Sequence, residues 1–200
     1  MVRKGITALI FALCISLTSI LPAYAIFSDV PLTTYYYTAV NELASREIIS
    51  GFADGRYRPD EPVTRAQMAK LIAVANSLPL TSDVTESISF NDVPSSHWGS
   101  IYIIASANAG IINGYPDGTF RPDRPITRAE LARMLFLATR SPAYSPAKAT
   151  FSDVSGGFWA FSEIETMVFC GIVNGYPDGT YRPDQEATRA QTAVMLYKML

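Results

Sequence analysis

The sequence predicts a mainly α-helical protein that is built from three copies of one helix-loop-helix unit. The segments that begin at Phe27, Phe90 and Phe151 align with one another without a gap. Each segment also holds two runs of apolar residues at helical spacing, separated by a glycine-rich loop. Because one helix pair of this length cannot bury its own apolar face, we expect the copies to pack on one another into a single body.

Residues 1–25 have the features of a secretory signal peptide. Arg3 and Lys4 precede an apolar run at 6–21, and an A-Y-A cleavage site follows at 23–25. A retained membrane anchor is the alternative, but the serines and threonines within the run favour cleavage. We therefore expect export, with no membrane span left in the mature chain.

The composition bounds the function. With 48% hydrophobic and 17% charged residues, the chain is typical of a globular protein. Loss of the two positive charges of the signal would take the formal net charge from −2 to −4, which argues against nucleic acid as a partner. Cys170 would remain as a single cysteine, so no internal disulfide is expected, and its apolar helical pattern predicts burial.

The repeats are expected at 27–76, 90–139 and 151–200, joined by linkers rich in Ser, Thr, Pro and Ala. Each copy opens with the pattern Phe-x-Asp-Val, and the Asp is expected to make local hydrogen bonds. Eight residues after the Phe, a second aromatic marks the start of the first helix; the three are Tyr35, Trp98 and Trp159. Loops at 51–55, 114–118 and 175–179 end these helices, and Thr-Arg-Ala-Gln/Glu then opens each second helix.

These motifs, namely F-S-D-V, G-Y-P-D-G-T-[FY]-R-P-D and T-R-A-[EQ], resemble three S-layer homology domains in tandem. The resemblance implies a pseudo-threefold, three-pronged bundle with the first helices at its centre. It also implies a protein of the cell wall or S-layer at the bacterial surface, which docks without covalent bonds onto secondary cell-wall polysaccharide. The implied ligand carries a pyruvylated sugar, held in grooves between prongs by the Arg of the T-R-A-E motif.

The arginines of this motif are the main candidate ligand-binding residues. Thr at the N-cap and Glu or Gln three residues later form a capping box worth about 1 kcal/mol, which explains those residues but not the Arg between them. A cation in the first helical turn is unfavourable by about 0.3–1 kcal/mol. A salt bridge to Asp117 or Asp123 is one explanation. The other, which the resemblance favours, is that the arginines and the helix N-termini behind them face an anion; they are Arg65, Arg128 and Arg189.

Tyr35, Trp98 and Trp159 are either core residues or platforms for stacking a sugar. The first copy has Tyr35 in place of Trp, and Glu47 where the other copies have glycine, so its pocket is expected to differ most. The last loop glycines either let backbone amides approach a ligand or simply make the turn; they are Gly55, Gly118 and Gly179.

We expect neither a metal, a cofactor nor catalysis. The loop aspartates lack the alternating oxygen ligands and distal Glu of a calcium loop. His97 is the single histidine of the sequence, and it has no counterpart in the other copies. The alternative to glycan binding is a structural tether or a self-assembling envelope protein that acts through peptidoglycan or protein contacts. The residues identify no cargo or partner protein.

Overall fold

The computed structural model describes residues 27–80 and 88–200, and this part of the chain is helical. Each repeat contributes two helices, as predicted. They are α1 (Tyr37–Ser45), α2 (Arg65–Ala75), α3 (Ser100–Asn108), α4 (Arg128–Thr139), α5 (Phe161–Phe169) and α6 (Arg189–Met199). The predicted signal peptide lies outside the described residues. Within the described ranges, no helix has the length and apolar character needed to cross a membrane.

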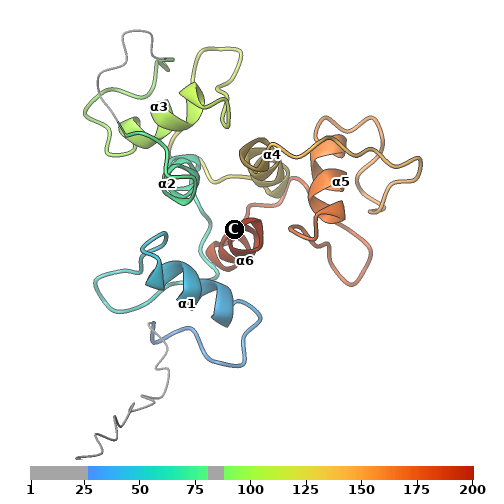
Figure 1. Ribbon diagram of the computed structural model, residues 1–200, viewed down its shortest axis with the longest axis horizontal. Coiled ribbons are helices and arrows are strands. Elements are labelled where there is room, and N and C mark those ends of the chain that lie inside the picture. The colour runs from blue at the N-terminus through green and yellow to red at the C-terminus, as the bar shows by residue number, and fades with distance from the viewer. Residues whose placement is uncertain (1–26, 81–87) are drawn as a thin grey trace, which may run out of the picture.

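The second helix of each repeat, not the first, lies at the centre of the molecule (Figure 1). There α4 packs against both α2 and α6, while α1, α3 and α5 lie outside them. The expectation that the first helices occupy the centre is therefore wrong. The reason lies in the N-termini of the second helices, because the first amide of each donates to a carbonyl of a neighbouring repeat: Arg65 to Arg124, Arg128 to Gln185 and Arg189 to Glu61.

Every prong joins helices from two different repeats. Helix α3 of the second repeat packs on α2 of the first, α5 of the third packs on α4 of the second, and α1 packs on α6. The first and last helices of the described chain thus close a circle (Figure 1). No repeat buries its own apolar face by itself, in agreement with the expected single body.

Backbone hydrogen bonds close the same circle immediately before the second helices. The amide of Val63 donates to the carbonyl of Ala187 at 3.1 Å, Ala187 donates to Ile126 at 2.9 Å, and Ile126 donates to Val63 at 2.8 Å. Each of the three residues donates once and accepts once, so the ring leaves none of these buried groups unpaired.

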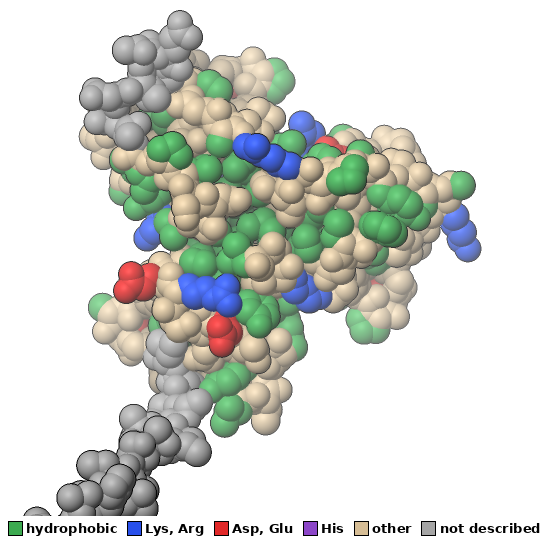
Figure 2. Space-filling view, in the orientation of Figure 1, with side chains coloured by type: hydrophobic (Ala, Val, Ile, Leu, Met, Phe, Trp, Pro, Cys, Tyr) green, Lys and Arg blue, Asp and Glu red, His purple; other side chains and the backbone are tan. Residues whose placement is uncertain are grey.

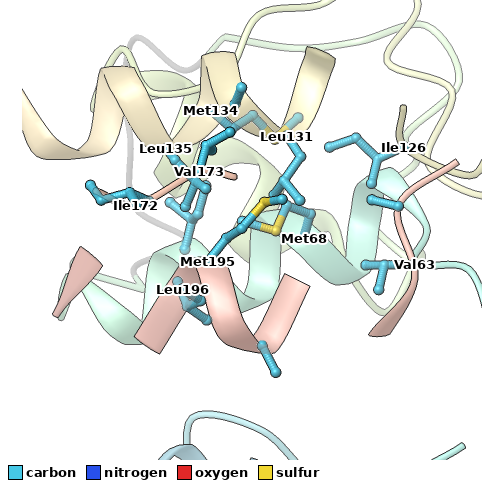
Figure 3. Packing of buried hydrophobic residues seen from close by; sticks show 14 of the residues in the cluster. Val63, Met68, Ile126, Leu131, Met134, Leu135, Ile172, Val173, Met195 and Leu196 are labelled. Carbon is cyan, nitrogen blue, oxygen red and sulfur yellow. The ribbon is translucent and has the colours of Figure 1, made fainter. Parts of the chain in front are cut away.

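Apolar side chains of the three central helices meet next to this ring (Figure 3), among them Met68, Leu131 and Met195. The third repeat has Thr192 at the position that Met68 and Leu131 hold in the other two. Thr192 is 1% exposed, and its hydroxyl has no hydrogen-bond partner among the described residues. A polar group thus occupies an apolar position, which costs stability.

The first helices end at residues with positive φ. Gly110 and Gly171 have φ of 72° and 73°, which glycine adopts without strain, but Glu47 takes the same turn at 58°. In the third repeat the last turn of α5 points outward, which leaves Phe169 and Cys170 exposed. The expected burial of Cys170 is therefore wrong, because the buried residues of α5 end at Met167.

Candidate ligand-binding grooves

Each second helix begins with Arg at its first position, and all three predicted capping boxes are present. The first two amides of the helix donate to carbonyls of a neighbouring repeat. In α4, Arg128 N lies 2.8 Å from Gln185 O, and Ala129 N lies 2.9 Å from Pro183 O. Because these N–H groups already have acceptors, the helix N-terminus is not available to help hold an anion, contrary to expectation.

The arginine side chains clamp the loop of the neighbouring repeat. Arg128 is 2% exposed; its Nε donates to Tyr181 O at 2.8 Å and its Nη2 donates to Asn174 O at 3.0 Å. The other two bond in the same way, Arg65 to Phe120 O and Asn113 O, and Arg189 to Tyr57 O and Ser50 O. None of the three pairs with Asp117 or Asp123, so the predicted salt bridges are replaced by bonds to carbonyls.

One edge of each guanidinium is left over by this clamp. A guanidinium carries five N–H groups, and the two carbonyl bonds use Nε and one hydrogen of Nη2. In the described part of the chain, Nη1 of Arg128 and Nη1 of Arg189 have no hydrogen-bond partner, and neither atom is sealed from solvent. Nη1 of Arg65 lies 3.5 Å from Glu130 Oε1. The arginines are thus structural on one edge and, in two cases, available on the other.

All three arginines line grooves between the repeats. Groove 1 has a volume of about 220 Å³, groove 2 about 640 Å³ and groove 3 about 310 Å³. Groove 1 is lined by Ser50, Gly51, Phe52, Gln67, Lys70, Trp98 and Arg189. Groove 2 is lined by Arg65, Asn113, Gly114, Tyr115, Glu130, Arg133 and Trp159. Groove 3 is lined by Tyr35, Arg128, Asn174, Gly175, Tyr176, Gln191 and Lys198.

Every groove takes residues from all three repeats. One repeat supplies the arginine, a second supplies the loop and second helix, and a third supplies the exposed aromatic. The pocket expected for the first copy is therefore not one site: Tyr35 lies in groove 3 with Arg128, and Arg65 lies in groove 2 with Trp159. Glu47 lines none of the three grooves.

The three aromatics beside the grooves are exposed. Tyr35 is 69% exposed, Trp98 53% and Trp159 50%, which excludes a core role. An exposed indole at a groove offers an apolar face and one N–H donor, as stacking against a sugar ring requires. On the face shown in Figure 2, basic side chains occur singly among apolar ones on all three prongs.

The last loop glycines lie outside the grooves and make turns. Gly55, Gly118 and Gly179 have φ between 77° and 80°, and their carbonyls accept the amide hydrogens of the residues after the repeat's opening Phe. The first loop glycines line the grooves instead. A Cβ at Gly175 would lie 2.2 Å from the ring of Phe151, so a side chain does not fit there. Of the two roles expected for the last loop glycines the structure shows the turn, and the glycines that line the grooves are Gly51, Gly114 and Gly175.

Sequence reasoning also missed the residue at the third position of each second helix. Gln67, Glu130 and Gln191 complete the capping boxes, and the same side chains line the three grooves. The capping box alone was enough to explain these residues, so their second role, lining the grooves, was not predicted. The opening aspartates were misplaced as well: Asp153 accepts the amides of Tyr181 and Arg182, far along the repeat, instead of bonding locally.

Glu130 is the centre of a charged network in groove 2. Its Oε2 accepts the Thr127 amide at 3.0 Å, and its Oε1 accepts the Tyr115 hydroxyl at 2.8 Å and a hydrogen bond from Arg124. Burial by itself would raise the pKa of Glu130, but the hydrogen bonds from Thr127 and Tyr115, together with the charges of Arg65 and Arg124, hold this pKa below its ordinary value. Glu130 is therefore ionised at neutral pH. Across residues 27–80 and 88–200, no three His, Cys, Asp or Glu side chains gather as a metal site requires.

Comparison with known proteins places these motifs in a family. The S-layer homology domain matches three times, at residues 26–69, 89–132 and 150–193. The chain is 33% identical over 157 residues to the cellulosome-anchoring protein of Acetivibrio thermocellus, which covers 76% of this chain and 35% of that protein. It is 30% identical over 169 residues to S-layer protein EA1 of Bacillus anthracis, covering 84% of the chain and 19% of that protein.

An enzyme is among the relatives too. The amylopullulanase of Thermoanaerobacterium thermosulfurigenes is 36% identical over 167 residues, covering 80% of this chain but 9% of the enzyme. The chain therefore spans about a third or less of each of these relatives. With three matched domains that make up most of its length, the chain is a cell-surface protein that belongs to the S-layer homology domain family.

Proposed function

We propose that the protein anchors to the cell wall by binding, without covalent bonds, a secondary cell-wall polysaccharide that carries pyruvyl ketals. The observation that supports this most directly is the repeated pairing, within each groove, of a rigidly held guanidinium with an exposed aromatic ring. The clamp on the neighbouring loop orients the guanidinium in advance, so little conformational entropy is lost when a ligand binds.

The two groups suit the two parts of such a sugar. A ketal carboxylate accepts charge-assisted hydrogen bonds, which the remaining N–H groups of Arg128 and Arg189 can donate. The apolar face of the sugar ring stacks on Trp98, Trp159 or Tyr35. Three grooves on one body can engage one polymer together, so weak single contacts add up to stable attachment.

Sedimentation with purified wall sacculi tests this proposal. The protein is expected to pellet with sacculi that carry the polysaccharide and to stay in solution with sacculi from which the polymer has been removed. The double variant Trp98→Ala, Trp159→Ala should pellet at least about tenfold less well. Phe169→Ala is the matched control, because Phe169 is an exposed aromatic that lies outside the three grooves.

Other outcomes would identify the alternatives. Equal pelleting with stripped and intact sacculi would contradict polysaccharide binding and favour a tether to peptidoglycan. Concentration-dependent assembly without any glycan, measured by size-exclusion chromatography, would favour self-association. We also propose that the chain binds without catalysis, so labelled polysaccharide should be recovered at its original length.

A further inference from the structure

We infer that the three grooves bind different sugars. Grooves 1 and 3 bind the acidic sugar, whereas groove 2, in which the Glu130 carboxylate already pairs with Arg65, binds an uncharged one. This inference rests on the proposed function and deepens it. According to it, the residue at the third position of the second helix determines whether a groove binds an acidic or a neutral sugar.

The difference begins with one atom of each arginine. In groove 2, Nη1 of Arg65 already has a carboxylate oxygen of Glu130 at 3.5 Å. In grooves 1 and 3 the equivalent residues are Gln67 and Gln191, whose amides carry no charge. Within the described part of the chain, Glu130 is the one acidic side chain that lines any of the three grooves. A ligand carboxylate that enters groove 2 would find the Glu130 carboxylate already beside Arg65 and would be repelled by its negative charge.

The other cations in and beside groove 2 do not compensate for this; Arg133 lines the groove, whereas Arg124 lies beside it and pairs with Glu130. Arg124 bonds to Glu130 and to the Tyr115 hydroxyl, and Nη1 of Arg133 lies 3.5 Å from Glu163 Oε1. Both are therefore paired with carboxylates of the protein. In groove 1, by contrast, Lys70 has no carboxylate partner among the described residues; in groove 3, Lys198 Nζ lies 2.9 Å from the side-chain amide of Asn174. Grooves 1 and 3 thus keep two cations each without an acid.

Groove 2 remains a good site for an uncharged sugar. The Glu130 side chain is 16% exposed and can accept hydrogen bonds from sugar hydroxyls. Trp159, half exposed, provides the stacking surface, and groove 2 is the most spacious of the three at about 640 Å³. Groove 2 therefore excludes negatively charged sugars but not uncharged ones.

The two tryptophans allow grooves 1 and 2 to be observed separately. Trp98 lines groove 1 and Trp159 lines groove 2, and they are the two tryptophans of the sequence. We would titrate the ¹⁵N-labelled protein with the pyruvyl ketal of a methyl hexopyranoside, and separately with the methyl ester of that ketal. The indole N–H shift of each tryptophan then gives the affinity of its own groove for the acid and for the neutral ester.

We expect Trp98 to report at least about tenfold tighter binding of the acid than of the ester, and Trp159 to report no preference for the acid. Glu130→Gln should raise the acid preference at Trp159 about tenfold, and Gln67→Glu should lower it at Trp98 by a similar factor. Both variants keep the capping box, which Gln and Glu each complete in this chain, so both should remain folded, as melting curves would check.

Two results would separate the inference from the function on which it rests. If both indoles report the same acid preference in the wild type, or if Glu130→Gln leaves Trp159 unchanged, the inference is wrong while sugar binding stands. If neither probe shifts either indole at any concentration, sugar binding in the grooves fails, and the inference fails with it.

Discussion

The arginine clamps and the grooves are made from the same repeated motifs, yet only the clamps are equivalent in all three copies. The arginine Nε bonds to a loop carbonyl at 2.7, 2.8 and 2.7 Å in the three repeats. At one groove position, by contrast, the residues are Lys70, Arg133 and Val194. The circle of contacts between repeats closes only if all three clamps form, whereas a groove residue can change without breaking any contact of that circle. Substitutions that break a clamp should therefore affect stability, and substitutions of groove residues outside the clamp should affect binding.

The largest effect is expected for Arg128→Ala. Removing the side chain leaves the carbonyl of the buried Tyr181 and that of Asn174 without their donors, which should lower the free energy of unfolding by about 3 kcal/mol. Urea denaturation followed by circular dichroism measures it. Trp159→Ala, a groove change at a half-exposed side chain, should alter stability by less than about 0.5 kcal/mol. Equal effects for both variants would remove the distinction between clamp and groove.

Asp153→Asn should come next. Oδ1 accepts the amide of Tyr181 at 2.8 Å and Oδ2 accepts that of Arg182 at 2.7 Å, and in an asparagine one of these two oxygens is replaced by an NH2 group, which cannot accept. We expect a loss of about 2 kcal/mol in the free energy of unfolding, measured by thermal denaturation. Asp184→Asn is the control, because Asp184 is exposed and should tolerate the change. A similar loss in both variants would mean that the aspartate does not join the two ends of the repeat.

A gain in stability is expected for Thr192→Val. The Thr192 hydroxyl is buried without a partner among the described residues, so replacing it by a methyl group should raise the free energy of unfolding by about 1 kcal/mol. Thr166→Val should have the opposite sign, because the buried Thr166 hydroxyl donates to Ser162 O at 2.6 Å. If both changes destabilise the protein, the central helices depend on that hydroxyl in some other way.

The smallest effect concerns acid. The pKa of Glu130 lies below its ordinary value of 4.5 in the folded protein, so the stability it contributes is complete above that value and is lost as the pH falls through the folded pKa. Glu130→Gln should remove this loss, so the variant should lose less stability than the wild type below about pH 4.5. Melting temperatures measured across this range would show it. Parallel curves for the two proteins would mean that the network in groove 2 contributes nothing to acid sensitivity.

Much of the local structure was predictable from the residues alone. The six helices of residues 27–80 and 88–200, the three capping boxes and the position of Arg128 at the first turn follow from short-range patterns. Errors arose where a residue's partner lies in another repeat. The Arg128 side chain was expected to face Asp117 or a ligand, but it bonds to carbonyls more than forty residues away along the chain. Cys170 was expected to be buried but is exposed, because the sequence of a nine-residue helix does not show whether its last turn faces the core or the solvent.

By itself the sequence determined the unit, its threefold repetition and the family, because helix periodicity, caps and turns depend on neighbours along the chain. Only the tertiary structure decided that the second helices form the centre, that each groove is assembled from three repeats, and that Glu130 faces Arg65. Three units that share the same motifs can pair in several orders with similar local contacts. The order is chosen by which closed arrangement satisfies every buried carbonyl and amide at once, and that condition belongs to the whole molecule.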